Sequence, residues 1–202
     1  IIHNPLQLLF RREYYQNCYK MAPHTGPEEM VGYWGKPTST VDWCEQNYVT
    51  TYYLAEFWNT ITNLGMIISA IYGIVDSFRQ SFGRRYIVCY ALLLLTGIGS
   101  WMFHMTLLFE MQLLDELLMV WGGSFMLYSL YRARNSFRDG GKAVGVTLLC
   151  YAIVVTVACL LSKSPVFFQV MEGTLVFAIV LLTIRSVSYT HLRAHETLRY
   201  LV

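Results

Sequence analysis

The sequence predicts an all-α fold, a polytopic bundle of transmembrane helices. Of its 202 residues, 55% are hydrophobic and only 14% are charged, whereas average globular chains carry roughly 25% charged residues. The apolar residues also gather in runs long enough for a helix to cross a bilayer, which takes about 20 residues. The net charge of +2 excludes a strongly basic nucleic-acid binder, and the apolar content excludes a disordered chain.

Five apolar runs predict five membrane-spanning helices. They are Phe57–Val75, Tyr86–Met105, Gln112–Tyr131, Ala143–Leu161 and Phe167–Ile184. The first, second and fourth runs contain no Asp, Glu, Lys or Arg. The third holds Asp115 and Glu116 near its start, and we interpret it as a span because Leu117–Tyr131 continues apolar. In lipid, packed helices satisfy every backbone polar group.

The distribution of Lys and Arg predicts the orientation of the bundle. Basic residues gather in the first and third connections between spans, at Arg79, Arg84, Arg85, Arg132, Arg134, Arg138 and Lys142. The second connection carries none, and the segment before the first span is acidic. Because basic loops stay on the cytoplasmic side, residues 21–56 are predicted to be a luminal or extracellular segment.

Both ends of the sequence depart from this pattern. Residues 1–20 precede the first Met, Met21, and lack the apolar core of a signal peptide, so we interpret them as translated leader. Residues 187–202 turn abruptly polar and are typical of an adapter-derived tail. The spacing of His191 and His195 within that tail is then a coincidence. On this interpretation the natural protein continues past residue 186, and 57–186 is a truncated membrane domain.

Polar side chains at membrane depth are costly and therefore candidate functional residues. Ser100 and His104 lie one turn apart at the end of the second predicted span, and Asp115 opens the third across a short turn. An antiparallel helix pair joined so tightly is expected to bring the three together at the luminal end.

Three interpretations of this cluster differ in their chemistry. A Ser–His–Asp relay fails on geometry, because Ser and His on one helix leave the His little freedom to act as an oriented base. A zinc site would use imidazole nitrogen and a nearby carboxylate. A plain hydrogen bond between His104 and Asp115 that joins two helices is the structural alternative. One histidine cannot hold zinc by itself, so the residues leave the last two interpretations open.

A second cluster precedes the first span. Oxygen donors fall at Asp42, Glu45 and Asn47, with Glu56 further along. Calcium takes six to eight such oxygens, although the spacing is not that of an EF-hand. The alternative is helix capping, with Asp42 as N-cap and Glu45 at the third position of a capping box.

Several long motifs resemble the alkaline ceramidase family. They are Met21–Pro23, Gly32–Gly35, Thr38–Glu45, Ala55–Thr60, Ser100–Leu107 and Glu110–Glu116. The resemblance implies a seven-helix membrane hydrolase, of which five spans are present, that cleaves the ceramide amide bond to give a sphingoid base and a fatty acid. It also implies residence in the endoplasmic reticulum or Golgi, among membrane lipids.

The resemblance also implies site residues and cofactors. His104 matches a zinc histidine, Ser100 a serine beside the metal, and Asp115 the base for water. The calcium ligands matched are Asp42, Trp43 through its carbonyl, Glu45, Asn47 and Glu56. The family's other two zinc histidines lie in a late span that this sequence lacks, so we expect the 202-residue chain alone to be inactive. A non-catalytic receptor or transporter remnant is the alternative, for which a helix broken at Gly122–Gly123 would be expected.

Overall fold

The computed structural model describes residues 31–41, 43, 45–134, 141–162 and 164–199, with side chains as far as Ser188. In these ranges it has five helices: α2 (Phe57–Arg79), α3 (Arg84–Thr106), α4 (Phe109–Arg134), α5 (Gly141–Ser162) and α6 (Pro165–Arg199). Each is long and apolar enough to cross a membrane. The five predicted spans and the all-α class are therefore confirmed.

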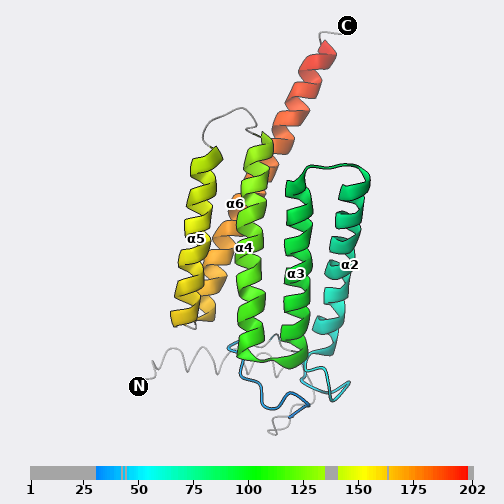
Figure 1. Ribbon diagram of the computed structural model, residues 1–202, viewed down its shortest axis with the longest axis vertical. Coiled ribbons are helices and arrows are strands. Elements are labelled where there is room, and N and C mark those ends of the chain that lie inside the picture. The colour runs from blue at the N-terminus through cyan, green and yellow to red at the C-terminus, as the bar shows by residue number, and fades with distance from the viewer. Residues whose placement is uncertain (1–30, 42, 44, 135–140, 163, 200–202) are drawn as a thin grey trace.

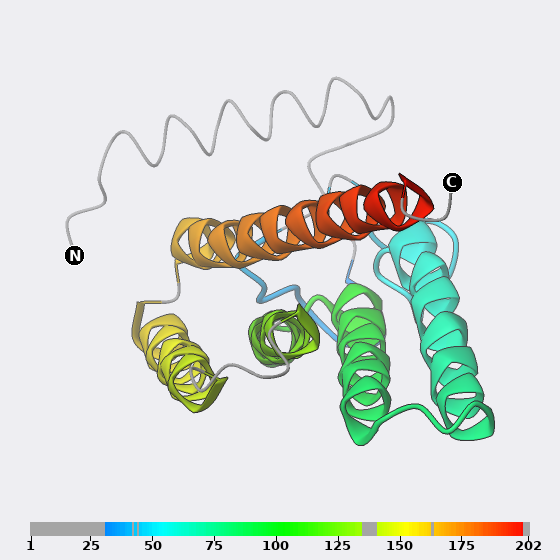
Figure 2. The ribbon, with the colours of Figure 1, turned by 90° about the horizontal axis from the view of Figure 1, so that it is seen from above.

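The first four helices form a row in chain order. Helices α2, α3, α4 and α5 run side by side, and α6 lies across the row (Figures 1 and 2). Contacts join α2 to α3 and α3 to α4, while both α5 and α6 pack on α4. Helix α4 therefore connects the two halves of the bundle.

Small residues make the close helix contacts, as expected where lipid provides no hydrophobic drive between helices. The buried positions of α3 include Thr96, Gly97, Gly99 and Ser100. Large apolar side chains point outward instead, and Ile68 and Val154 are each 64% exposed. Small residues inside and large apolar side chains outside are the reverse of the arrangement in a water-soluble protein, and they agree with a membrane-spanning bundle.

Gly73 of α2 packs against the Tyr90 ring of α3, and we expect Gly73→Ala to destabilise the bundle. A Cβ there would overlap that ring, and overpacking typically costs about 1–3 kcal/mol. Gly65→Ala on the same helix is the matched control, because its Cβ would meet nothing within 4 Å. Unfolding in mixed detergent micelles measures both. Equal stability of the two variants would contradict the packing shown by the structure.

The turn between α3 and α4 supports the segment before α2. Helix α3 ends at Thr106, Leu107 adopts a left-handed conformation with φ of 50°, and α4 begins at Phe109. The Ala55 and Glu56 N–H groups donate to the carbonyls of Met105 (2.9 Å) and His104 (3.0 Å). The N–H groups of 38 and 39 both donate to the Leu107 carbonyl at 3.0 Å. The 31–56 segment is thus fastened to the end of the α3–α4 hairpin.

All five helices extend beyond the predicted spans, and two of the extensions bear on earlier predictions. Helix α4 begins three residues before Gln112 and runs uninterrupted through Gly122–Gly123, so the break expected of a transporter is not found there. Helix α6 continues to Arg199, through most of the residues interpreted as a tail. The origin of that tail stays a prediction, and the His191 and His195 side chains lie outside the described residues.

Candidate catalytic and metal site

The structure brings Ser100, His104 and Asp115 together, as their spacing predicts. Helix α3 carries Ser100 and His104 one turn apart, and Asp115 lies in the second turn of α4. Gly99 lies at the contact between the two helices, since a Cβ there would be 3.1 Å from Leu118 Cδ1 and in ordinary contact with the Asp115 Cα at 3.5 Å. Serine and aspartate are only 9% and 8% exposed.

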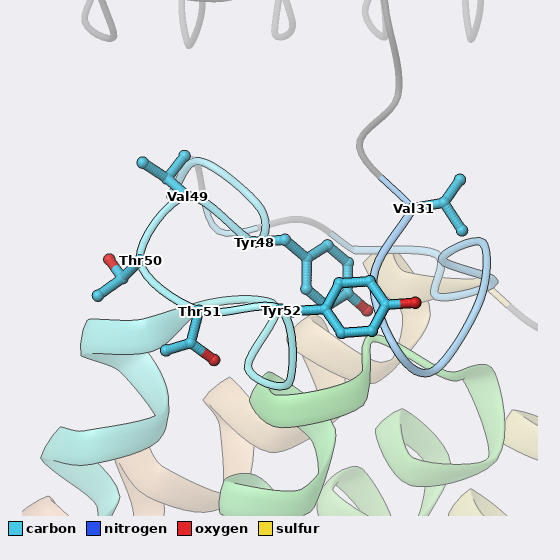
Figure 3. A pocket seen from close by; sticks show the side chains of 6 residues that line it. All are labelled: Val31, Tyr48, Val49, Thr50, Thr51 and Tyr52. Carbon is cyan, nitrogen blue, oxygen red and sulfur yellow. The ribbon is translucent and has the colours of Figure 1, made fainter.

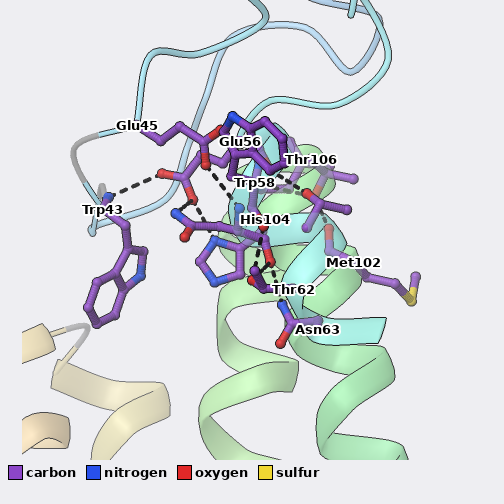
Figure 4. Close-up of polar contacts among 12 residues, drawn as sticks. Trp43, Glu45, Glu56, Trp58, Thr62, Asn63, Met102, His104 and Thr106 are labelled. Atoms are coloured by element: carbon purple, nitrogen blue, oxygen red, sulfur yellow. Dashed lines mark hydrogen bonds and ion pairs between the residues drawn. The ribbon is translucent and has the colours of Figure 1, made fainter. Parts of the chain in front are cut away.

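The hydrogen-bond partner of His104 is Glu56. Its Nδ1 lies 2.5 Å from Glu56 Oε2, and Glu56 is fully buried at the start of α2 (Figure 4). A direct His104–Asp115 hydrogen bond, the structural alternative, is not present among the described residues, and the partner of Nδ1 is a carboxylate that the resemblance assigned to calcium. A His that donates through Nδ1 has Nε2 as its free acceptor, the arrangement seen for metal-binding histidines with a carboxylate partner.

Asp115 retains an uncommitted oxygen. Its Oδ1 is buried and has no hydrogen-bond partner among the described residues. A buried acceptor without a partner costs free energy, and such groups recur at functional sites. An oxygen of this kind, beside an imidazole, suits proton transfer or contact with a metal-bound ligand.

Two carboxylates organise the start of α2 (Figure 4). Glu56 Oε1 accepts the Trp43 N–H at 3.1 Å, and Oε2 accepts the Asn59 side-chain amide at 3.2 Å. Glu45 accepts the N–H groups of Trp58 at 2.7 Å and Asn59 at 3.0 Å. Asn59 therefore touches both carboxylates and holds them side by side.

The capping predicted for Glu45 occurs on a different helix. The described residues around it, 41, 43 and 45–50, are not helical, so the capping box starting at Asp42 is wrong. Glu45 instead caps α2 from 11 residues before its N-cap, Glu56, whose own side chain makes no capping bond. A carboxylate near the N-terminus of a helix also interacts favourably with the positive end of the helix dipole.

The calcium ligands predicted by resemblance lie partly within this network. Asn47 Oδ1 is buried and has no partner in the described part of the chain, which fits an oxygen that would face a cation. Next to it Tyr48 takes a left-handed φ of 59°, and burial, with a smaller effect of Tyr52, raises the pKa of its phenol. Asp42 lies outside the described residues. Among those described, no three His, Cys, Asp or Glu side chains gather closely enough to hold a metal by themselves.

Sequence analysis missed the polar contact that ties the segment to α4. Gln112, 2% exposed, accepts the Thr40 N–H at 2.7 Å and donates to the Thr40 hydroxyl at 2.8 Å. It also donates to Glu116 Oε1 at 2.7 Å. Gln112 and Glu116 stand four residues apart in an apolar run, a signal visible in the sequence. Glu172 in α6, with a buried oxygen that has no partner among the described residues, was also missed.

We expect Thr40→Val to lower the free energy of unfolding by about 1–2 kcal/mol. The variant keeps the shape but removes the hydroxyl bonded to Gln112, and each net hydrogen bond contributes roughly 0.5–1.5 kcal/mol. Thr40→Ser keeps the hydroxyl and is the matched control. Denaturation in mixed micelles compares the three proteins, and a Val variant as stable as the Ser variant would contradict the assigned bond.

Comparison with known proteins adds independent information. A ceramidase family model matches residues 35–202. The chain is 46% identical over 171 residues to alkaline ceramidase 3 of Mus musculus, covering 85% of this chain and 63% of the relative. It is 35% identical over 175 residues to an alkaline ceramidase of Saccharomyces cerevisiae, covering 85% and 50%. The chain thus spans between half and two thirds of the length of these relatives.

Proposed function

Because the chain belongs to the ceramidase family, we propose that the protein hydrolyses the amide bond of ceramides, phytoceramide and dihydroceramide types included. The products are a sphingoid base and a free fatty acid. The observation that carries the proposal is the cluster of half-buried His104 with buried Ser100 and Asp115 near the turn of the α3–α4 hairpin, where one Asp115 oxygen has no partner among the described residues.

We propose zinc as the cofactor at His104, with Nε2 as the binding nitrogen. The contact of Nδ1 with Glu56 supports this, because it orients the ring. A catalytic zinc takes three protein ligands, and the described residues supply only part of that set. The remaining ligands would come from outside those residues. Bound zinc supplies Lewis-acid polarisation of a carbonyl.

The protein's own groups have separate roles in the proposed reaction. The unpartnered Asp115 oxygen would accept a proton from the attacking water as the new C–O bond forms. The same carboxyl would then give the proton to the amine nitrogen as the C–N bond breaks. Ser100, buried on α3 one turn before His104, would orient the carboxyl or donate to the developing oxyanion.

We propose that calcium binds at the start of α2. Its ligands would be Glu45, Glu56, the buried Asn47 oxygen and the Trp43 carbonyl, together with Asp42. Two observations support the proposal. The Glu45 and Glu56 carboxylates both accept hydrogen bonds from Asn59, and the Asn47 oxygen has no partner among the described residues. Glu56 would then contact both the cation and His104, so that calcium binding would fix the orientation of the histidine.

The protein is an integral membrane protein by its five apolar helices. We propose that it resides in the endoplasmic reticulum or Golgi with the 31–56 segment in the lumen. The charge distribution supports this orientation. Arg79, Arg84 and Arg85 lie at the opposite end of the bundle, and so do Arg132 and Arg134 of α4.

An assay of the full-length protein in lipid vesicles tests the function. We expect release of sphingoid base from ceramide, loss of that release on chelation of divalent metals, and recovery with Zn²⁺. Calcium-selective chelation tests the second site separately. Hydrolysis that persists without zinc would contradict the cofactor but not the activity. No hydrolysis with both metals present would contradict the activity itself.

A further inference from the structure

Four aromatic side chains form one surface on the 31–56 segment, which we call the aromatic platform: Tyr33, Trp34, Tyr52 and Tyr53. The Tyr33 ring lies 4.9 Å from that of Trp34 and 5.3 Å from that of Tyr53, centre to centre. The rings of 52 and 53 are 5.7 Å apart. Two loops distant in sequence therefore share a continuous aromatic surface.

The platform is both exposed and held in place. Its members are 57%, 37%, 58% and 60% exposed in sequence order. The Trp34 indole N–H donates to the Tyr53 carbonyl at 2.8 Å, and the Tyr33 N–H donates to the Tyr52 carbonyl at 3.0 Å. One backbone bond and one side-chain bond thus join the two loops while all four rings remain partly exposed. A contiguous apolar patch of this kind marks a binding surface rather than a surface that faces bulk water.

The platform is continuous with the lipid-facing side of α2. Tyr53 lies four residues before Phe57, where the membrane-spanning helix begins. Trp58, in the first turn, is 66% exposed, and Ile61 and Ile68 continue the exposed apolar side of the helix. The aromatic rings therefore stand where the bilayer core gives way to its headgroups.

A cavity beside the platform is lined by uncharged side chains. A shallow cavity of about 320 Å³ opens beside Tyr52 (Figure 3). It is lined by Val31, Tyr48, Val49, Thr50, Thr51 and Tyr52. Neutral hydroxyl and apolar groups together suit the ester and glycerol layer of a membrane rather than an anionic ligand.

We propose that the aromatic platform lies in the headgroup layer of the bilayer and fixes the depth of the 31–56 segment. Tyr and Trp favour this layer because their rings are apolar and their polar groups can meet water or headgroups. The four platform side chains are themselves uncharged, so we expect their contact with the bilayer not to depend on anionic lipid. The same segment carries Glu56, and its depth therefore sets the depth of the Glu56–His104 pair. The proposal does not rest on ceramide hydrolysis.

Quenching of Trp34 fluorescence tests the proposal in the full-length protein reconstituted into vesicles. The lipids carry bromine near either the carbonyl end or the methyl end of the acyl chain. The Trp34 signal is the difference between unmodified protein and Trp34→Phe. Trp121, 38% exposed in the middle of α4, provides the control through Trp121→Phe. We expect the shallow bromine to quench Trp34 best and the deep bromine to quench Trp121 best.

Each other outcome overturns the proposal. Quenching of Trp34 by aqueous iodide alone would place the platform in water. Protection from both iodide and bromine would indicate a protein cover, such as a partner or another part of the chain. A second comparison pairs Tyr52→Ser/Tyr53→Ser with Tyr52→Phe/Tyr53→Phe. The Ser pair is expected to lose most of the lipid quenching and the Phe pair to retain it, whether the lipid is zwitterionic or anionic. Equal quenching in the two pairs, or quenching that appears only with anionic lipid, would overturn the proposal.

Discussion

Asp115→Asn is expected to lower kcat for ceramide hydrolysis by about 10²–10⁴-fold, the usual contribution of a positioned general base. The amide keeps the shape of the carboxyl but cannot accept the proton of the attacking water. Because Asp115 Oδ1 has no partner among the described residues, the substitution breaks no bond assigned to that oxygen. Steady-state kinetics in vesicles measure the loss, and thermal unfolding checks that the variant remains folded.

Glu116→Gln is the matched control for this prediction. It removes the neighbouring charge on the same helix but keeps an oxygen that can accept from Gln112. We expect it to retain most of the activity. If Asp115→Asn is as active as the Glu116 variant, Asp115 is a structural residue and the proposed proton transfer is wrong.

Glu56→Ala has the second largest expected effect, because three groups lose their acceptor together. They are His104 Nδ1, the Trp43 N–H and the Asn59 side-chain amide. Loss of the carboxylate partner of a metal-binding histidine typically costs about 10–100-fold in metal affinity or activity. Leaving buried polar groups unpaired adds about 1–3 kcal/mol of destabilisation for each. Competition with a fluorescent zinc chelator measures affinity, and denaturation in mixed micelles measures stability.

The control variant for Glu56 is Glu45→Gln. It retains an oxygen for the α2 amides and does not touch His104, so we expect zinc affinity to remain near that of the unmodified protein while calcium affinity falls. Both variants are measured in parallel. Unchanged zinc affinity in Glu56→Ala would separate the two sites and refute the role of Glu56 in orienting His104.

The sequence was sufficient for the parts of the structure that depend on local pattern. Continuous apolar runs predicted all five helices, and the short turn between the second and third predicted spans predicted that Asp115 would lie near the end of α3. Periodicity says less about where a helix ends. Helix α4 begins at Phe109 rather than near Gln112, because the connection that follows α3 is only two residues long.

The non-local contacts of the site could not be predicted in the same way. Glu56 and His104 are 48 residues apart, and Thr40 and Gln112 are 72 apart. Their meeting depends on the path of the irregular 31–56 segment, which has no periodicity to read. Glu45 is an example. The sequence suggested that it caps a helix beginning near Asp42, whereas the structure places it at the backbone amides of α2.

The backbone bonds to the end of α3 also constrain the order in which the protein is made. The N–H groups of Thr38 and Glu56 donate to carbonyls of Leu107 and His104, which leave the ribosome later than the segment itself. Because the ribosome adds roughly 5–20 residues per second, Thr38 and Glu56 are synthesised several seconds before the carbonyls to which they donate. In the proposed luminal orientation, the 31–56 segment would cross the membrane first and remain undocked until the α3–α4 hairpin has inserted. Its protection from protease during synthesis is expected to appear only after that insertion.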